Sequence, residues 1–154
     1  MVTYRERLRV PVLWAVVAVA VAVVLAAEIH AGAEGWRSVV PYAVLPPLAL
    51  VWAVLASRHE VRLEDGVLHV PGARAPVSAF DGPRVLDREA LRRVRGPQAD
   101  ARAWVAVPSW VGTGVLLPVV DPDDDTPYWV VASRRPEQLA AAITAALTAA
   151  AARA

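Results

Sequence analysis

Two long apolar segments near the start of the chain dominate its pattern of hydrophobic and polar residues. Val10–Ala27 and Val39–Ala56 contain no charged residue. At about 1.5 Å of rise per residue, each would form a helix of roughly 27 Å, close to the ~30 Å thickness of a bilayer's hydrocarbon core. The pattern therefore predicts a transmembrane helical hairpin over residues 1–57, with spans at about 10–27 and 39–56, followed by a separate domain over residues 58–154.

The charges that flank the apolar segments indicate how the hairpin is oriented. Three arginines precede the first segment, and Arg58 and Arg62 follow the second, whereas the loop between the segments holds Arg37 with two glutamates. Positive residues beside a span stay in the cytoplasm. We therefore expect a multi-pass plasma-membrane protein with both termini in the cytoplasm. Residues 31–33 are similar to a signal-peptide cleavage site, but the apolar run is longer than a typical ~7–15-residue signal core.

After the second span, apolar and polar residues alternate with a period of two, which is typical of half-buried strands. Asp65-Gly66 has the composition of a type I′ turn, so the residues on either side of it predict a β-hairpin. In that hairpin Leu63 faces Leu68 on the buried side, and Arg62 shares the other side with His69. Further short strands are predicted at residues 77–80, 84–86, 102–107, 115–120 and 128–132.

Two helices complete the predicted domain. Asp87 is a suitable N-cap for a short helix that ends at Gly96-Pro97. From Pro136 the chain is rich in alanine, with leucine or isoleucine at every fourth position over residues 139–147, which predicts an amphipathic helix. We therefore expect a membrane α+β protein whose β-rich domain is a pleckstrin-homology-like bent sheet or partly open barrel with a C-terminal helix. A two-layer α+β sandwich is the alternative.

Composition limits the chemistry that the chain can perform. The absence of cysteine excludes disulfides and thiolate metal sites, and a net charge of +1 gives no field that favours nucleic acid. No ionisable residue lies deep in either apolar segment, which argues against a proton relay or an ion path. No cofactor is expected.

An acidic cluster is the first candidate site. It consists of Asp121, Asp123, Asp124 and Asp125. Carboxylate oxygens are ligands for Mg²⁺ or Ca²⁺, but the EF-hand pattern is absent because Thr126 and Ala132 stand where it needs Gly and Glu. The simplest interpretation is a turn between strands, with metal binding and partner contact as alternatives.

Two further groups of residues are candidates for binding. Trp129, if it faces outward, would form a partner-binding surface with Arg134, Arg135 and the acidic cluster, whereas core packing is the alternative role for this tryptophan. A basic patch near the short helix could face anionic lipid headgroups, although a solvated helix face is the simpler interpretation. Its members are Arg88, Arg92, Arg93 and Arg95.

Several short motifs resemble those of a family of small actinobacterial membrane proteins that is filed as a domain of unknown function. The motifs are YRERL at residues 4–8, GPQADARA at residues 96–103, and the combination of DP, TPYW and SRRP within residues 121–136. The resemblance covers nearly the whole chain. It implies an actinobacterial plasma-membrane protein, and it brings no activity and no catalytic residue.

These features lead us to expect a non-catalytic, membrane-tethered interaction or scaffold module that contacts a protein partner, a second copy or the leaflet. One alternative is a membrane-associated enzyme that uses a divalent metal at residues 121–125. Another is an accessory subunit of a larger membrane complex, with a kink at Pro46-Pro47 shaped to fit a neighbouring helix.

Overall fold

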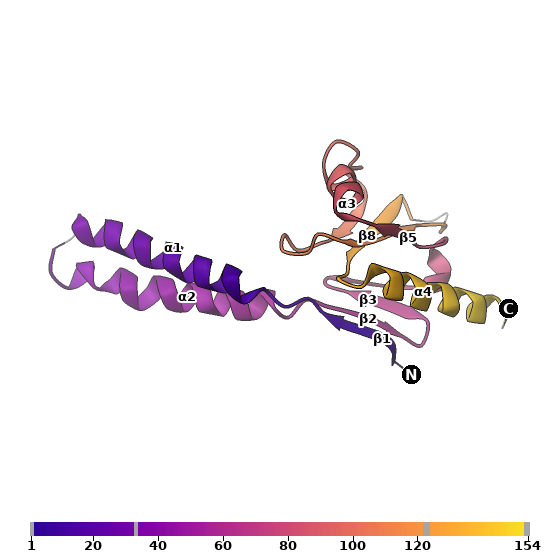
Figure 1. Ribbon diagram of the computed structural model, residues 1–154, viewed down its shortest axis with the longest axis horizontal. Helices are drawn as coiled ribbons and strands as arrows, with labels where there is room; N and C mark the ends of the chain where they lie inside the picture. Colours follow the sequence, from indigo (N-terminus) through magenta and orange to yellow (C-terminus); the bar gives the residue numbers. More distant parts are fainter. Residues whose placement is uncertain (1, 33, 122–123, 153–154) are drawn as a thin grey trace. The chain divides into compact units, whose positions relative to one another are not determined.

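The computed structural model describes residues 2–32, 34–121 and 124–152, and the chain forms two compact units (Figure 1). The hairpin unit is Arg9–Arg58, and the sheet unit combines Met1–Leu8 with His59–Ala154. Residues 2–8 therefore group with the sheet unit, whereas the predicted hairpin runs from residue 1 to residue 57. The reason is a strand, β1 (Val2–Arg7), which pairs antiparallel with β2 (Glu60–Glu64), so that the hairpin unit is inserted between two paired strands.

The hairpin unit contains two helices that are long and apolar enough to cross a membrane, by length and composition. They are α1 (Val12–Ala31) and α2 (Val40–Ala56), joined through the 3-10 turn η1 (Gly35–Ser38). Alanines fill the contact between the helices: Ala22, Ala26 and Ala53 are all buried. Such small side chains let two helix backbones approach closely, which is how helices pack when the hydrophobic effect does not drive them together.

Large apolar side chains lie on the outer surface of the hairpin unit. Leu13 is 72% exposed and Val54 is 59% exposed. Helix α2 begins with a proline in its first turn, where the missing N–H costs little, and the helix continues past Pro46 and Pro47.

The first sheet of the sheet unit is antiparallel, in the order β1, β2, β3 (Val67–Val70) and β4 (Ala73–Pro76). The predicted β-hairpin is confirmed. Leu63 pairs with Leu68 and Arg62 pairs with His69. Asp65 and Gly66 have φ of 49° and 76°, the two positive values that a type I′ turn requires.

The second sheet has the order β5 (Arg84–Leu86), β7 (Gly114–Pro118), β8 (Tyr128–Ala132) and β6 (Trp104–Ala106), and its β6–β8 pair is parallel. The strand predicted at residues 77–80 is wrong. Residues 77–79 form the 3-10 turn η2 (Val77–Ala79), because the Phe80 N–H donates back to the Val77 carbonyl at 3.0 Å. Within the described residues the two sheets remain separate and form no closed barrel.

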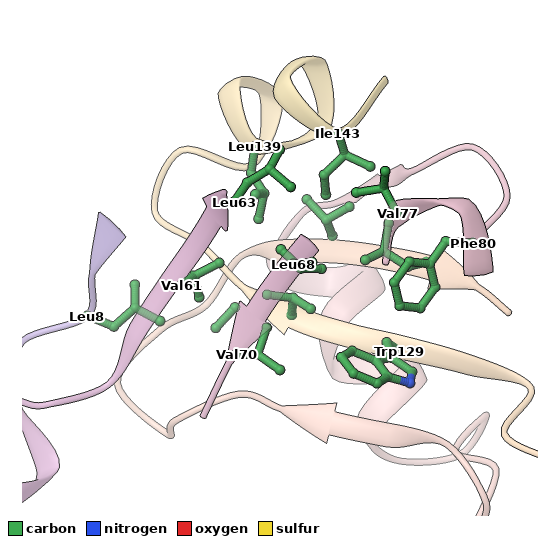
Figure 2. Close-up of a cluster of buried hydrophobic side chains, with 14 of the residues drawn as sticks. Leu8, Val61, Leu63, Leu68, Val70, Val77, Phe80, Trp129, Leu139 and Ile143 are labelled. Atoms are coloured by element: carbon green, nitrogen blue, oxygen red, sulfur yellow. The ribbon is translucent and has the colours of Figure 1, made fainter. Parts of the chain in front are cut away.

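Both predicted helices are present in the sheet unit. The Asp87 side chain accepts a hydrogen bond from the Ala90 N–H at 2.8 Å and so caps α3 (Arg88–Arg95). In Figure 2, Leu139 and Ile143 of α4 (Pro136–Ala151) point into the core that contains Leu63 and Leu68 of the first sheet. The sheet unit is therefore an α+β fold.

Strand β8 lies between two hydrophobic clusters. Trp129 and Val131 pack in the main core with the first sheet and α4, whereas Val130 packs with Leu86 and with Leu91 of α3 in a second cluster. Because four of its five residues are buried, β8 is the central strand around which the C-terminal half assembles.

Candidate functional site

A buried carboxylate joins the beginning of the chain to its C-terminal part. Glu6 of β1 is 5% exposed. Its carboxylate accepts hydrogen bonds from the Ser133 hydroxyl at 2.6 Å and from the Arg134 backbone N–H at 3.0 Å. The Tyr4 hydroxyl donates to the same carboxylate at 2.7 Å. We call this group of Tyr4, Glu6 and Ser133 the Glu6 junction.

The chemistry of the Glu6 junction is that of a satisfied polar network. Ser133 is completely buried, and its hydroxyl oxygen also accepts from the Arg135 N–H at 3.0 Å. Among the described residues, no buried side-chain nitrogen or oxygen lacks a hydrogen-bond partner. Burial raises the pKa of Tyr4 to about 12, and the neighbouring Glu6 carboxylate adds to that rise. The junction therefore has the features of a structural joint, because its serine is inaccessible to a substrate in solution.

A second joint holds residues 96–103 against β8. The Tyr128 hydroxyl accepts from the Asp100 N–H at 3.1 Å, and it donates to the Gln98 carbonyl at 3.5 Å. The Asp100 carboxylate in turn accepts from Arg102, which lowers the pKa of Asp100. These hydrogen bonds fix the position of the segment that precedes β6, the strand that pairs in parallel with β8.

The predicted partner-binding surface lacks its tryptophan. Trp129 is 7% exposed and packs between Phe80, with ring centroids 5.2 Å apart, and Trp104, at 6.0 Å. Trp129 is therefore unavailable to a partner, because its side chain points from a central strand into the core. Arg134 and Arg135 are exposed at the start of α4, and Trp104 on β6 retains 39% exposure.

The acidic cluster forms a turn, to the extent that it is described. Asp121, Asp124 and Asp125 are exposed, whereas Asp123 lies outside the described residues. The Asp124 carboxylate accepts from the Thr126 N–H at 2.8 Å, and this hydrogen bonding by Thr126 lowers the pKa of Asp124. In the part of the chain that the structure describes, no group of three or more acidic or histidine residues is placed to hold a metal ion. Metal binding here remains a prediction.

The predicted basic patch lies on α3 and the residue at its end. Arg88, Arg92, Arg93 and Arg95 are all exposed. Arg93 pairs with Glu89 one helical turn earlier, at 3.5 Å. Such an exposed ion pair contributes little to stability. Because all four arginines are exposed, they form a solvated helix face that is accessible to an anionic ligand.

Comparison with known proteins gives a family for the chain. A family model described as a protein of unknown function (DUF3093) matches residues 3–143. The chain belongs to this family. No curated protein and no solved structure matches it. The DUF3093 match runs from β1 into α4, so it includes both sheets and the hairpin unit inserted between β1 and β2.

The motifs identified in the sequence meet in pairs in the structure, one pair at the Glu6 junction and the other at the contact between Tyr128 and Asp100. YRERL supplies Tyr4 and Glu6, and SRRP supplies Ser133, so these two motifs of the DUF3093 chain meet at the Glu6 junction. GPQADARA and TPYW meet where Tyr128 contacts Asp100. The role of Glu6 was missed. The signal in the sequence is the alternation of Tyr4, Glu6 and Leu8 with Arg5 and Arg7, in which a glutamate occupies a position on the buried face.

Proposed function

We propose that this chain is a membrane-anchored, non-catalytic interaction module. In this proposal the hairpin unit is embedded in the plasma membrane of an actinobacterium, and the sheet unit faces the cytoplasm, where it contacts a protein partner, a second copy or the leaflet.

The pairing of β1 with β2 is the observation that carries the proposal. These strands flank the hairpin unit in the chain, yet both belong to one sheet, with Arg7 paired to Glu60. The two flanks must therefore lie on the same side of any membrane that the hairpin crosses. The arginines of both flanks favour the cytoplasmic side.

The same pairing argues against a cleaved signal peptide. Cleavage near residue 33 would remove β1, and with it the buried side chains of Glu6 and Leu8. The loss of Glu6 would leave the Ser133 hydroxyl and the Arg134 N–H without their acceptor, and an unsatisfied buried polar group costs about 1–3 kcal/mol.

The hydrogen bonding of the buried polar groups among the described residues supports an interaction role. Glu6 and Ser133 are fully engaged with each other and with the backbone, which leaves no reactive pair open to solvent at that joint. A partner would then meet exposed charges, and we place the partner-binding surface at Arg134 and Arg135 together with the acidic turn of Asp121, Asp124 and Asp125. Two short sheets followed by a helix are compatible with the pleckstrin-homology-like plan, whose domains are interaction modules.

Membrane anchorage is tested by expressing the full chain in a bacterial host and extracting the membranes with alkaline carbonate. We expect the chain to stay with the membrane and a C-terminal reporter to be active in the cytoplasm. A reporter inserted at the η1 turn should be active on the opposite side. Release by carbonate, or a C-terminus outside the cell, would contradict the proposal.

The partner-binding surface is tested by in-cell cross-linking of the wild type and of the R134Q/R135Q variant. We expect the variant to lose cross-linked species that the wild type forms. The R92Q/R93Q variant is the matched control, because it removes two exposed arginines from α3, and it should keep those species. If both variants cross-link as the wild type does, the surface is assigned wrongly.

A further inference from the structure

A row of basic residues crosses the outer face of the first sheet. Its register places Arg5 opposite Arg62, Arg62 opposite His69, and His69 opposite Arg74. One residue from each of the four strands thus contributes to a single line, which we call the cationic row. The neighbours of these residues along each strand, such as Leu63 and Leu68, point to the opposite, buried face.

The pairing of Arg5 opposite Arg62 within this row does not by itself stabilise the sheet. Neighbouring strands lie about 4.8 Å apart, and like charges directly opposite each other destabilise a sheet. Two glutamates on β2 offset part of this repulsion. Glu60 accepts from Arg5 at 2.6 Å, and Glu64 lies 3.3 Å from Arg62.

The neutralisation of the row is incomplete. Glu60 is shared, because Arg7 also donates to it at 3.2 Å, so one carboxylate serves two guanidinium groups. Arg74 is exposed and makes no ion pair with any of the described residues. Four arginines therefore stand against two glutamates on this face, which leaves an excess of positive charge available to an anion.

We propose that the cationic row binds the anionic phospholipid headgroups of the membrane that anchors the chain. This inference rests on the proposed function, because it needs the hairpin unit to be in a bilayer. A guanidinium group matches a phosphate with two parallel hydrogen bonds, and arginines spaced across a flat sheet face suit a layer of such phosphates.

Chain connectivity favours lipid over a soluble acidic partner. Arg5 precedes the start of α1 at Val12 by seven positions, and Arg62 follows the end of α2 at Ala56 by six. Extended chain spans at most about 3.6 Å per residue, so the seven residues from Arg5 to the start of α1 and the six from Ala56 to Arg62 reach no further than about 25 Å from a bilayer that holds the helices. The arginines of α3 have no such connection, since α3 begins thirty-two residues after Ala56.

The test uses the full chain in nanodiscs of phosphatidylcholine alone and in nanodiscs that also contain phosphatidylglycerol. The measured quantity is the midpoint, the urea concentration at which half of the sheet unit is unfolded. Pulse proteolysis measures the unfolded fraction at each urea concentration. A ligand that binds the folded state raises this midpoint. We expect a higher midpoint with phosphatidylglycerol for the wild type, and a smaller increase at high salt, because ions screen exposed charges.

Two matched variants test whether the cationic row or the arginines of α3 cause the phosphatidylglycerol-dependent increase. The R62Q/R74Q variant should lose most of the phosphatidylglycerol-dependent increase, since two arginines near an anionic surface account for about a thirtyfold change in binding. The R92Q/R93Q variant removes the same charge from α3 and should keep the increase. Midpoints in phosphatidylcholine alone show whether each variant is folded as stably as the wild type.

Several outcomes would overturn the inference. One is an equal increase for R62Q/R74Q and the wild type, and another is loss of the increase in R92Q/R93Q. Glycerol phosphate or a polyglutamate peptide, added to phosphatidylcholine nanodiscs, should not reproduce the increase. If either does so while phosphatidylglycerol does not, a soluble anion is the ligand. Failure of the chain to enter nanodiscs would contradict the proposed function instead, so the two failures are distinguishable.

Discussion

The two units of the chain bury opposite kinds of side chain. In the sheet unit the largest fully buried side chains are apolar, such as Leu63, Leu117 and Ile143, and Glu6 is the exception among charged residues that otherwise lie at or near the surface of the described chain. In the hairpin unit the buried residues are small, such as Ala22 and Ala53, and leucines, valines and tryptophans lie outside. Burial of apolar area from water is favourable by about 25 cal/mol per Å², so the second arrangement is stable when something other than water covers those side chains. This difference between the two units is what the proposed membrane anchorage of the hairpin unit would require.

The largest expected effect comes from a matched pair of leucines, one in each unit. Leu8 is 1% exposed in the core of the sheet unit, whereas Leu13 is 72% exposed on α1. We expect Leu8→Ala to destabilise the sheet unit by about 2–5 kcal/mol, because the truncation leaves a cavity. Leu13→Ala should leave its stability unchanged. Urea unfolding of the full chain in nanodiscs measures both. Equal losses in the two variants would contradict the comparison.

A second prediction concerns the Glu6 junction. Glu6→Ala removes the acceptor of the Ser133 hydroxyl and of the Arg134 N–H, and should cost about 1–3 kcal/mol of unfolding free energy. Glu64→Ala, which removes a partly exposed glutamate from the adjacent strand, should cost less than about 1 kcal/mol. Urea unfolding again supplies the measurement. If Glu6→Ala were as stable as Glu64→Ala, β1 would not depend on this carboxylate for its place in the fold.

A third prediction places a large side chain, of the kind buried in the sheet unit, at a buried alanine between the two helices of the hairpin unit. Ala22→Leu inserts a large side chain into the contact between α1 and α2, and overpacking of this kind typically costs about 1–3 kcal/mol. Val16→Leu, at a position that is 58% exposed, is the control and should be neutral. Since the chain has no cysteine, a pair introduced into α1 and α2 reports helix contact by disulfide formation. Unchanged cross-linking in Ala22→Leu would show that the helices do not pack through alanines.

The last prediction is a pH dependence, and it is confined to strongly alkaline conditions. The pKa of Tyr4 in the folded state is raised from 10.0 to about 12 by burial, so the unfolded chain loses this proton first as the pH rises. The stability that Tyr4 contributes is therefore complete below pH 10 and is lost between about pH 10 and 12. Tyr4→Phe should lose less stability over this interval than the wild type does. Parallel losses in the two proteins would contradict this assignment.

Local signals in the sequence predicted much of the fold correctly. The Asp65-Gly66 turn determines the register of β2 and β3, because its backbone geometry admits a single pairing of the flanking residues. Asp87 marked the start of α3, and the spacing of Leu139 and Ile143 identified the buried face of α4. Each of these features depends on residues that are close together in the sequence.

Features that depend on distant pairing could not be predicted. The pairing of β1 with β2 joins residues on opposite sides of a fifty-residue insertion, and arginines before an apolar segment are equally typical of a span's flank. Trp129 could face either way until the parallel partner of β8 was known, because alternation separates it from Tyr128 without saying which of them points inward. The cationic row had a partial signal in the Arg62 and His69 pair, but the positions of Arg5 and Arg74 depend on strands that were not predicted.

The narrow gap between the two strands that flank the insertion has a consequence for protein engineering. The Leu8 N–H donates to the His59 carbonyl at 2.8 Å, so the chain leaves and re-enters the first sheet at neighbouring positions. A short glycine-containing connector could therefore replace Arg9–Arg58 and convert β1 and β2 into an ordinary β-hairpin. The expected product is a water-soluble sheet unit that keeps every buried side chain of its core. Such a protein would be suited to crystallisation and to ligand screening without detergent.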